Sequence, residues 1–151
     1  DLINMCYSGT YTYSEIRRLI NGNAGLMAYV GENDVKTVEE RAAGGDQACG
    51  EALDAMCYQI AKEVGAAATV LMGEVDAIVF TAGIGENNAQ VRALISQYTG
   101  FLGCEIDLEK NKAAVGVEAV ISTPESKVTA LVVPTNEELA IARETVRLVN
   151  A

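Results

Sequence analysis

Two glycines separated by one residue follow the most continuously apolar segment of the chain. Residues 75–81 are too continuously apolar to keep one face in water, which indicates a strand buried in a sheet and covered on both sides. Gly83 and Gly85 then let the backbone turn tightly and let a ligand approach Ile84 and its neighbours where a Cβ would block it. Asn87 is expected to cap the next helix, so that free amides and the positive end of the helix dipole face the same place. This segment is therefore a candidate ligand-binding turn at a strand end.

The spacing of these glycines does not identify the ligand. A strand-to-helix turn that binds nothing is as good an interpretation of a lone G-x-G as a binding turn. The segment is not a P-loop, because G-x-x-x-x-G-K-[ST] is missing. It is not a full dinucleotide fingerprint either, because Asn88 stands where the third glycine belongs.

The segment P-T-N-E-E supplies a second set of candidate residues, directly after a strand expected at residues 128–133. Thr135 and Glu138 have the spacing of a capping box for the last helix, which leaves Glu137 without a structural role. A carboxylate beside a strand end is suited to Mg²⁺, directly or through water. The alternative is an acidic first turn that complements the helix dipole, and it is favoured when this segment is considered alone.

Helices and strands alternate along the chain and must position both segments. The clearest helical pattern runs from residue 46 to about 72, and a T-x-x-E box predicts that a shorter helix begins at Thr12. Residues 25–31 are a brief apolar segment between glycines and are expected to be extended. Further strands are expected at residues 101–106, 117–122 and 128–133. This alternation indicates an α/β layer structure.

Composition excludes several kinds of function. The chain has 151 residues with 11 Lys and Arg against 21 Asp and Glu, a net charge of −10 that argues against nucleic-acid binding. Histidine is absent and the four cysteines form no C-x-x-C, which excludes Cys/His zinc sites and serine–histidine triads. No apolar run reaches the ~20 residues that a membrane-spanning helix needs, and no signal peptide is visible. We expect a cytoplasmic protein with reduced thiols and no membrane partner, and the missing initiator Met fits an excised fragment.

Taken together, the two segments resemble the acetate/propionate/butyrate kinase (acetokinase) family of the actin/sugar-kinase superfamily. F-T-A-G-I-G-E-N and V-V-P-T-N-E-E-L-A-I-A-R-E-T occur in the family's order, and the intervening F-L-G-C-E-I-D and I-S-T-P-E-S-K-V also fit. The resemblance implies an α/β fold, a ribonuclease-H-like or actin-like ATPase domain whose central mixed sheet is flanked by helices. It implies that residues 1–134 are the C-terminal nucleotide-binding domain of an acyl kinase. Residues 135–151 would be a terminal helix that packs on a missing N-terminal domain.

The resemblance also assigns roles to residues. Gly83, Ile84, Gly85 and Asn87 would lie against the adenosine and phosphates of ATP or ADP, with Ile84 packing on the adenine. Glu137, the first glutamate of N-E-E, would help to hold Mg²⁺. The capping-box argument points to the same glutamate.

The front of the chain resembles a different branch of the family. The segments C-Y-S-G, I-N-G, G-L-M-A-Y and D-A-M-C-Y-Q-I-A-K-E are closer to butyrate kinases. Acetate kinases usually carry S-S-D-[FLM]-R where this chain has E-N-D-V-K, so Asp34 is expected to serve the nucleotide as the family's aspartate does. Lys36, in the place of the family's arginine, is also expected to contact the nucleotide; it keeps the charge of that arginine but loses its planar fork. A divergent member and a chimeric sequence would both explain this mixture.

The implied reaction transfers a phosphoryl group between ATP and a short-chain carboxylate to give an acyl phosphate, mainly by positioning and charge neutralisation. The family's catalytic arginines, histidine and aspartate lie largely upstream, so we expect no catalytic residue in this fragment and no activity of it alone. Its expected partners are an adenine nucleotide, the missing domain and a second copy in a homodimer. Without that domain, apolar residues of the last helix should be partly exposed or be covered by self-association: Leu139, Ile141, Ala142 and Val146. The alternatives are a non-catalytic nucleotide-binding module and an interaction module in which both segments are only caps and turns.

Overall fold

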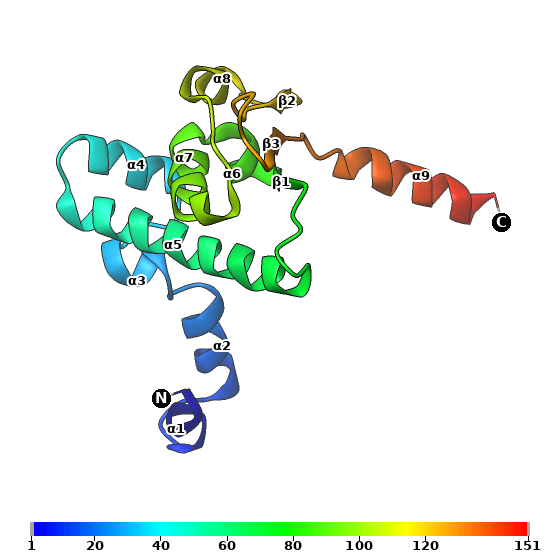
Figure 1. The fold of residues 1–151 in the computed structure, drawn as a ribbon. Coiled ribbons are helices and arrows are strands. Elements are labelled where there is room, and N and C mark those ends of the chain that lie inside the picture. Colours follow the sequence, from blue (N-terminus) through cyan, green and yellow to red (C-terminus); the bar gives the residue numbers. More distant parts are fainter. Residues whose placement is uncertain (1, 151) are drawn as a thin grey trace. The chain divides into compact units, whose positions relative to one another are not determined.

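The chain folds into two units, Asp1–Ile60 and Ala61–Ala151 (Figure 1). The computed structural model describes residues 2–150. The predicted domain 1–134 begins, and the predicted terminal helix 135–151 ends, one residue outside this described part. Helix α5 (Gln47–Val70) begins in the first unit and ends in the second. It confirms the long helix predicted from residue 46 to about 72.

The first unit is helical. It contains α1 (Leu2–Tyr7), α2 (Tyr13–Asn21), α3 (Leu26–Val30), α4 (Val35–Ala43) and the beginning of α5. The predicted capping box of α2 is confirmed, because Glu15 N donates to Thr12 Oγ1 at 3.3 Å and Thr12 N donates to Glu15 Oε2 at 2.7 Å.

The prediction that residues 25–31 are extended is wrong, because Leu26–Val30 is a short helix. Its bounding glycines explain the difference. Gly25 and Gly31 have φ values of 62° and 69°, so the backbone turns at both ends in conformations that a glycine adopts without strain. Apolar residues between two such turns complete one helical turn as readily as a short strand.

The second unit is a small mixed sheet with helices. Its elements after α5 are β1 (Ala77–Phe80), α6 (Ala82–Asn87), α7 (Ala89–Tyr98), the 3₁₀ helix η1 (Gly100–Leu102), α8 (Leu108–Ala113), β2 (Ala119–Val120), β3 (Thr129–Val132) and α9 (Glu137–Val149). The strand order is β1-β3-β2, with β1 parallel and β2 antiparallel to β3. The predicted α/β class with a mixed sheet is confirmed.

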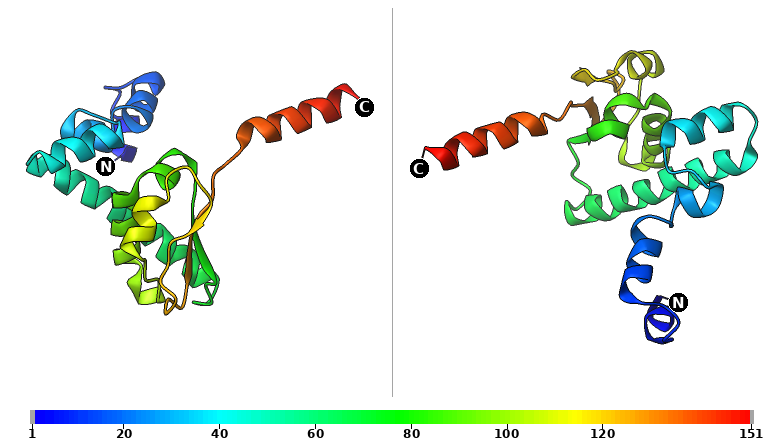
Figure 2. Two further views of the ribbon diagram at one scale, coloured as in Figure 1. Left: turned by 90° about the horizontal axis from the view of Figure 1, so that it is seen from above. Right: turned by 180° about the vertical axis from the view of Figure 1, so that it is seen from behind.

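Two strand predictions need correction. Residues 101–106 are not a strand: they begin within η1, and Ile106 makes only an isolated bridge to Ser122. Strand β1 is not covered on both faces, because Ile78 and Phe80 are buried while Val79 is 51% exposed. Figure 2 shows the reason: the helices that pack on this sheet lie on one of its faces.

Helix α9 has no buried residue. Leu139, Ile141, Ala142 and Val146 are all exposed, which confirms the predicted exposure of this helix. Its packing against a further domain stays a prediction. Among the described residues, no helix combines the length and apolar character needed to cross a membrane.

Candidate functional site

The two candidate segments begin side by side at one edge of the sheet. In the parallel register of β1 and β3, Phe80 pairs with Val132. The next residues stay together, because Val133 N donates to Phe80 O at 2.9 Å and Thr81 Oγ1 donates to Val133 O at 2.8 Å. The sheet therefore brings the G-I-G-E-N and P-T-N-E-E segments to the same place, at the carboxyl ends of its two parallel strands.

The G-I-G-E-N segment is not an open turn but the short helix α6, which follows Thr81 through a residue with positive φ, Ala82 (57°). The two glycines have different surroundings. A Cβ on Gly85 would lie 3.0 Å from the carbonyl carbon of Phe80, whereas a Cβ on Gly83 would meet nothing within 4 Å. Gly85 is thus required by the strand behind it, and the space beside Gly83 is open. Ile84 is 44% exposed and can contact a ligand.

The prediction that Asn87 caps the following helix is wrong by one residue. Asn88 is the cap of α7, because its Oδ1 accepts from Val91 N at 2.9 Å. Asn87 ends α6, where its Nδ2 donates to Gly83 O at 2.9 Å. The Asn87 side chain is exposed, and its bond to the Gly83 carbonyl stabilises the glycine segment.

The predicted capping box of the last helix is also wrong. Asn136 caps α9, since its Oδ1 accepts from Leu139 N at 2.9 Å. Thr135 instead donates its backbone N–H and its hydroxyl to Oε1 of Glu86, at 2.8 and 2.9 Å. These two bonds hold the pKa of the Glu86 carboxyl below its usual range. Sequence reasoning missed Glu86, whose partner is far away along the chain.

Glu137 lies in the first turn of α9 and is exposed. The described residues contain no group of three or more His, Cys, Asp or Glu that could hold a metal ion. A single carboxylate nevertheless fits Mg²⁺, which keeps several waters and takes one or two carboxylates together with substrate phosphates. At this end of the sheet, Glu137 is thus a single exposed carboxylate and, within the described part of the chain, not part of a cluster of metal ligands.

Arg92 of α7 supports the glycine segment from the interior. Its guanidinium is completely buried and donates to the carbonyl oxygens of Gly85 at 2.9 Å, Asn111 at 2.6 Å and Ala114 at 2.8 Å, and to Asn111 Oδ1 at 2.7 Å. Burial lowers the pKa of this arginine, and three carbonyls with one amide oxygen take the place of a carboxylate partner. The sequence contains a signal for this burial, because Arg92 and Ser96 lie at helical spacing on the buried face of α7 and the buried Thr99 follows directly after the helix.

The other two predicted nucleotide residues lie in the first unit. Asp34 caps α4, with Oδ2 accepting from Thr37 N at 3.3 Å and from Thr37 Oγ1 at 2.7 Å, and these bonds lower the pKa of its carboxyl. Lys36 is 80% exposed and lies 4.0 Å from Glu40. Both side chains occupy the exposed start of α4, where a ligand can reach them.

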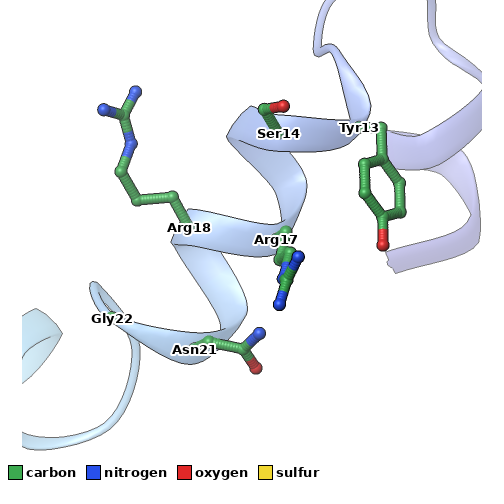
Figure 3. Close-up of a pocket in the computed structure, with 6 residues that line it drawn as sticks. All are labelled: Tyr13, Ser14, Arg17, Arg18, Asn21 and Gly22. Atoms are coloured by element: carbon green, nitrogen blue, oxygen red, sulfur yellow. The ribbon is translucent and has the colours of Figure 1, made fainter.

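A surface depression of about 410 Å³ lies along α2 in the first unit. Tyr13, Arg17, Arg18 and their neighbours line it, all from one helix, and the two arginines point in different directions (Figure 3). It contains none of the predicted site residues, and its charged groups do not converge on one point.

The second unit is thus an α/β domain whose candidate ligand site lies at the carboxyl ends of two parallel strands. The chain belongs to the acetokinase family, whose model matches residues 4–143. It is 49% identical over 136 residues to an acetate kinase of Carboxydothermus hydrogenoformans, and this alignment covers 90% of this chain and 34% of that protein. It is 47% identical over 139 residues to acetate kinase 1 of Neisseria meningitidis, covering 91% of this chain and 35% of that protein.

Solved structures agree with this assignment. The acetate kinase of Porphyromonas gingivalis matches with a TM-score of 0.85 and 36% identity, over 98% of this chain and 37% of that one. A propionate kinase of Francisella tularensis matches with a TM-score of 0.81 and 35% identity, over 94% of this chain and 35% of that one. These likenesses confirm the predicted actin-like ATPase fold. The chain spans about a third of the length of these relatives. The matches do not confirm that it is their C-terminal part; they establish the family and the covered share.

Proposed function

We propose that this chain supplies adenine-nucleotide and magnesium contacts in a kinase that transfers a phosphoryl group between ATP and a short-chain carboxylate (acetate, or propionate or butyrate), giving an acyl phosphate. The observation that carries the proposal is the meeting of the two candidate segments at one sheet edge. There Phe80 pairs with Val132, and Glu86 accepts two hydrogen bonds from Thr135.

The nucleotide would lie against α6. Gly83 leaves open space into which a phosphate or ribose can come close to the backbone, and the exposed Ile84 offers an apolar surface for the adenine. Gly85 and Asn87 support this segment through the contact with β1 and the bond to the Gly83 carbonyl. In the first unit, Asp34 and Lys36 are the residues that we propose as nucleotide contacts, because both are exposed at the start of α4.

Glu137 would hold the magnesium ion, directly or through water, and that ion supplies charge neutralisation to the phosphates. Glu86 positions the backbone that leads to Glu137, because both of its bonds go to Thr135, two residues earlier. The chain's own part in the reaction is therefore to bind and orient the nucleotide.

We further propose that the chain is inactive alone, because phosphoryl transfer also needs groups that neutralise the transferring phosphoryl and hold the carboxylate. The chain spans about a third of its relatives, which supports a missing partner domain. The exposed apolar residues of α9 suit packing against that domain or against a second copy in a homodimer. The cysteines of the described residues are all free, which supports a cytoplasmic setting.

Calorimetry with Mg-ADP tests the proposal on the chain as it is. The parent should bind, and Gly83→Ala should weaken binding about tenfold, because a Cβ enters the space proposed for the ligand. Gly50→Ala is the matched control, since Gly50 also lies in a helix with nothing within 4 Å of an added Cβ. Absence of binding by the folded parent would refute the nucleotide role and favour an interaction module.

A second assay tests whether the chain is inactive alone, and the source protein shows whether it is part of a kinase or a non-catalytic nucleotide-binding module. Acyl-phosphate formation from ATP and acetate should be undetectable with the purified chain. Detectable product, lost in Glu137→Gln, would overturn the proposed inactivity of the chain alone. Nucleotide binding in a protein that has no further kinase domain would instead favour a non-catalytic nucleotide-binding module.

A further inference from the structure

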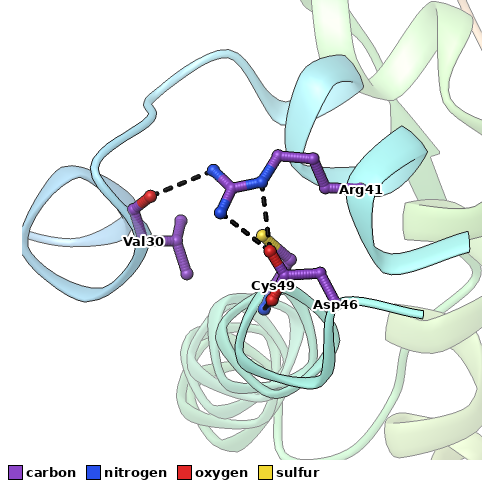
Figure 4. Close-up of polar contacts among 4 residues, drawn as sticks. All are labelled: Val30, Arg41, Asp46 and Cys49. Atoms are coloured by element: carbon purple, nitrogen blue, oxygen red, sulfur yellow. Dashed lines mark hydrogen bonds and ion pairs between the residues drawn. The ribbon is translucent and has the colours of Figure 1, made fainter. Parts of the chain in front are cut away.

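Arg41 is the centre of a hydrogen-bonded cluster in the first unit, which also includes the Asp46 side chain and backbone groups of Val30 and Cys49 (Figure 4). Arg41 Nε and Nη2 both donate to Asp46 Oδ2, at 3.1 and 2.8 Å, and Nη1 donates to Val30 O at 3.1 Å. The other carboxylate oxygen of Asp46, Oδ1, accepts from Cys49 N at 3.2 Å in the first turn of α5. One guanidinium thus joins the end of α3 to the start of α5, using the planar fork that a lysine lacks.

The position of Val30 gives this cluster a role beyond general stability. Val30 is the last residue of α3, and residues 31–34 then lead directly into α4. Arg41 lies near the end of α4 and reaches back to the residue before this loop. The loop is therefore held at both ends by α4: by Asp34 as its cap, and by the Arg41 bond to Val30.

The loop is ordered internally as well. Glu32 Oε1 accepts from the backbone N–H groups of Asn33 and Asp34, at 2.8 and 2.9 Å. What these bonds do not fix is the placement of the whole loop relative to the helices beside it. Two side-chain contacts of the described residues do so: Asp34 accepts from Thr37 of α4 at the end of the loop, and Arg41 donates to Val30 O just before its start.

We propose that Arg41 is a positioning residue for the nucleotide-facing start of α4: it fixes the loop 31–34 so that Asp34 and Lys36 are held ready for the ligand. This rests on the proposed function, because it assumes that these two side chains contact the nucleotide. Arg41 acts through the backbone of Val30 and the carboxylate of Asp46, to which its hydrogen bonds go.

Three variants of the cluster separate position from charge. Arg41→Gln removes both the fork and the charge, whereas Arg41→Lys keeps the charge but cannot reach Val30 and Asp46 as a fork. Asp46→Asn removes the negative charge and leaves a single oxygen, so either Arg41 or Cys49 N loses its acceptor. Arg17→Gln is the matched control, because Arg17 lies on the exposed surface of α2 in the same unit.

Two measurements on these variants test the positioning role of Arg41. Hydrogen exchange should become faster in residues 31–37 of Arg41→Gln and Arg41→Lys, should be unchanged in Arg17→Gln, and should be intermediate in Asp46→Asn, which weakens the anchor of Arg41 but leaves its bond to Val30 possible. Calorimetry should show about fivefold weaker Mg-ADP binding in the two Arg41 variants, with circular dichroism unchanged at the temperature used.

Each alternative outcome has its own meaning. Unchanged exchange in residues 31–37 would overturn the positioning role, and so would faster exchange with parent-like Mg-ADP affinity. Full recovery of affinity by Arg41→Lys would overturn it too, because charge alone would then explain the effect. Faster exchange in the Arg41 variants together with a parent that binds no Mg-ADP would refute the proposed function and the nucleotide part of this inference, and leave the ordering of the loop established.

Discussion

Replacement of the buried Arg92 by methionine should destabilise the second unit more than any surface change in it. Methionine fills a similar volume, yet it removes the donors that now satisfy the carbonyls of Gly85, Asn111 and Ala114 and the amide oxygen of Asn111. A buried acceptor that loses its donor costs ~1–3 kcal/mol, and the relief of no longer burying a charge offsets part of the sum. Four acceptors lose their donor, and the relief of the buried charge reduces the sum, so we expect a net loss of about 3–5 kcal/mol.

Hydrogen exchange followed by mass spectrometry is the right assay, because the chain has two units and global unfolding need not be two-state. Exchange in residues 77–98 should speed up by a factor that corresponds to this loss, while residues 13–43 should change little. Arg143→Met provides the control, because Arg143 lies on the exposed helix α9 of the same unit. A change for Arg92→Met of less than about 1 kcal/mol relative to Arg143→Met would refute the reasoning, since the carbonyls would then be satisfied without the guanidinium.

Three further predictions concern the edge of the sheet. Gly85→Ala should lower stability by about 1–3 kcal/mol in thermal melts, because its Cβ would meet the Phe80 backbone at 3.0 Å; an unchanged melt would contradict this tight contact. The Glu86–Thr135 pair should be intact above the ordinary pKa of a glutamate and lost as the pH falls through the lowered pKa of Glu86, so the Thr135 amide signal in NMR should shift in acid, and Glu86→Gln should abolish that shift. Asn136→Ala should cost ~1 kcal/mol of helix stability and speed amide exchange in the first turn of α9; unchanged exchange would show that its cap is redundant.

Local sequence patterns predicted the elements whose signals are local. The three-and-four repeat of apolar residues located α5, and the T-x-x-E spacing at Thr12 located the start of α2 together with both of its capping bonds. The alternation of apolar strands and helical patterns located β3 and the α/β class, whereas the mixed sheet was implied by the family resemblance. In each case the residues that decide the structure are neighbours in sequence, so the pattern contains the cause.

Where two local signals competed, sequence alone chose wrongly. Asn87 and Asn88 are both good caps, and which one caps α7 depends on where α6 ends, which is at Asn87. The T-x-x-E spacing of Thr135 and Glu138 is as good as that of Thr12 and Glu15. It fails because a partner from another segment takes Thr135, and spacing within one segment cannot reveal such a partner.

The register of the sheet explains why these local errors leave the candidate site intact. The parallel pairing of Phe80 with Val132 brings Thr81 and Val133 together whatever caps the helices that follow. The two chain segments leave the sheet side by side, so the Glu86 carboxylate of one lies within hydrogen-bonding distance of the Thr135 N–H and hydroxyl of the other. The roles of the residues within the site depend on caps and contacts of single side chains, but the meeting of the two segments depends on strand pairing. A substitution that breaks the β1–β3 register should therefore separate the segments, whereas loss of any one cap should only loosen them.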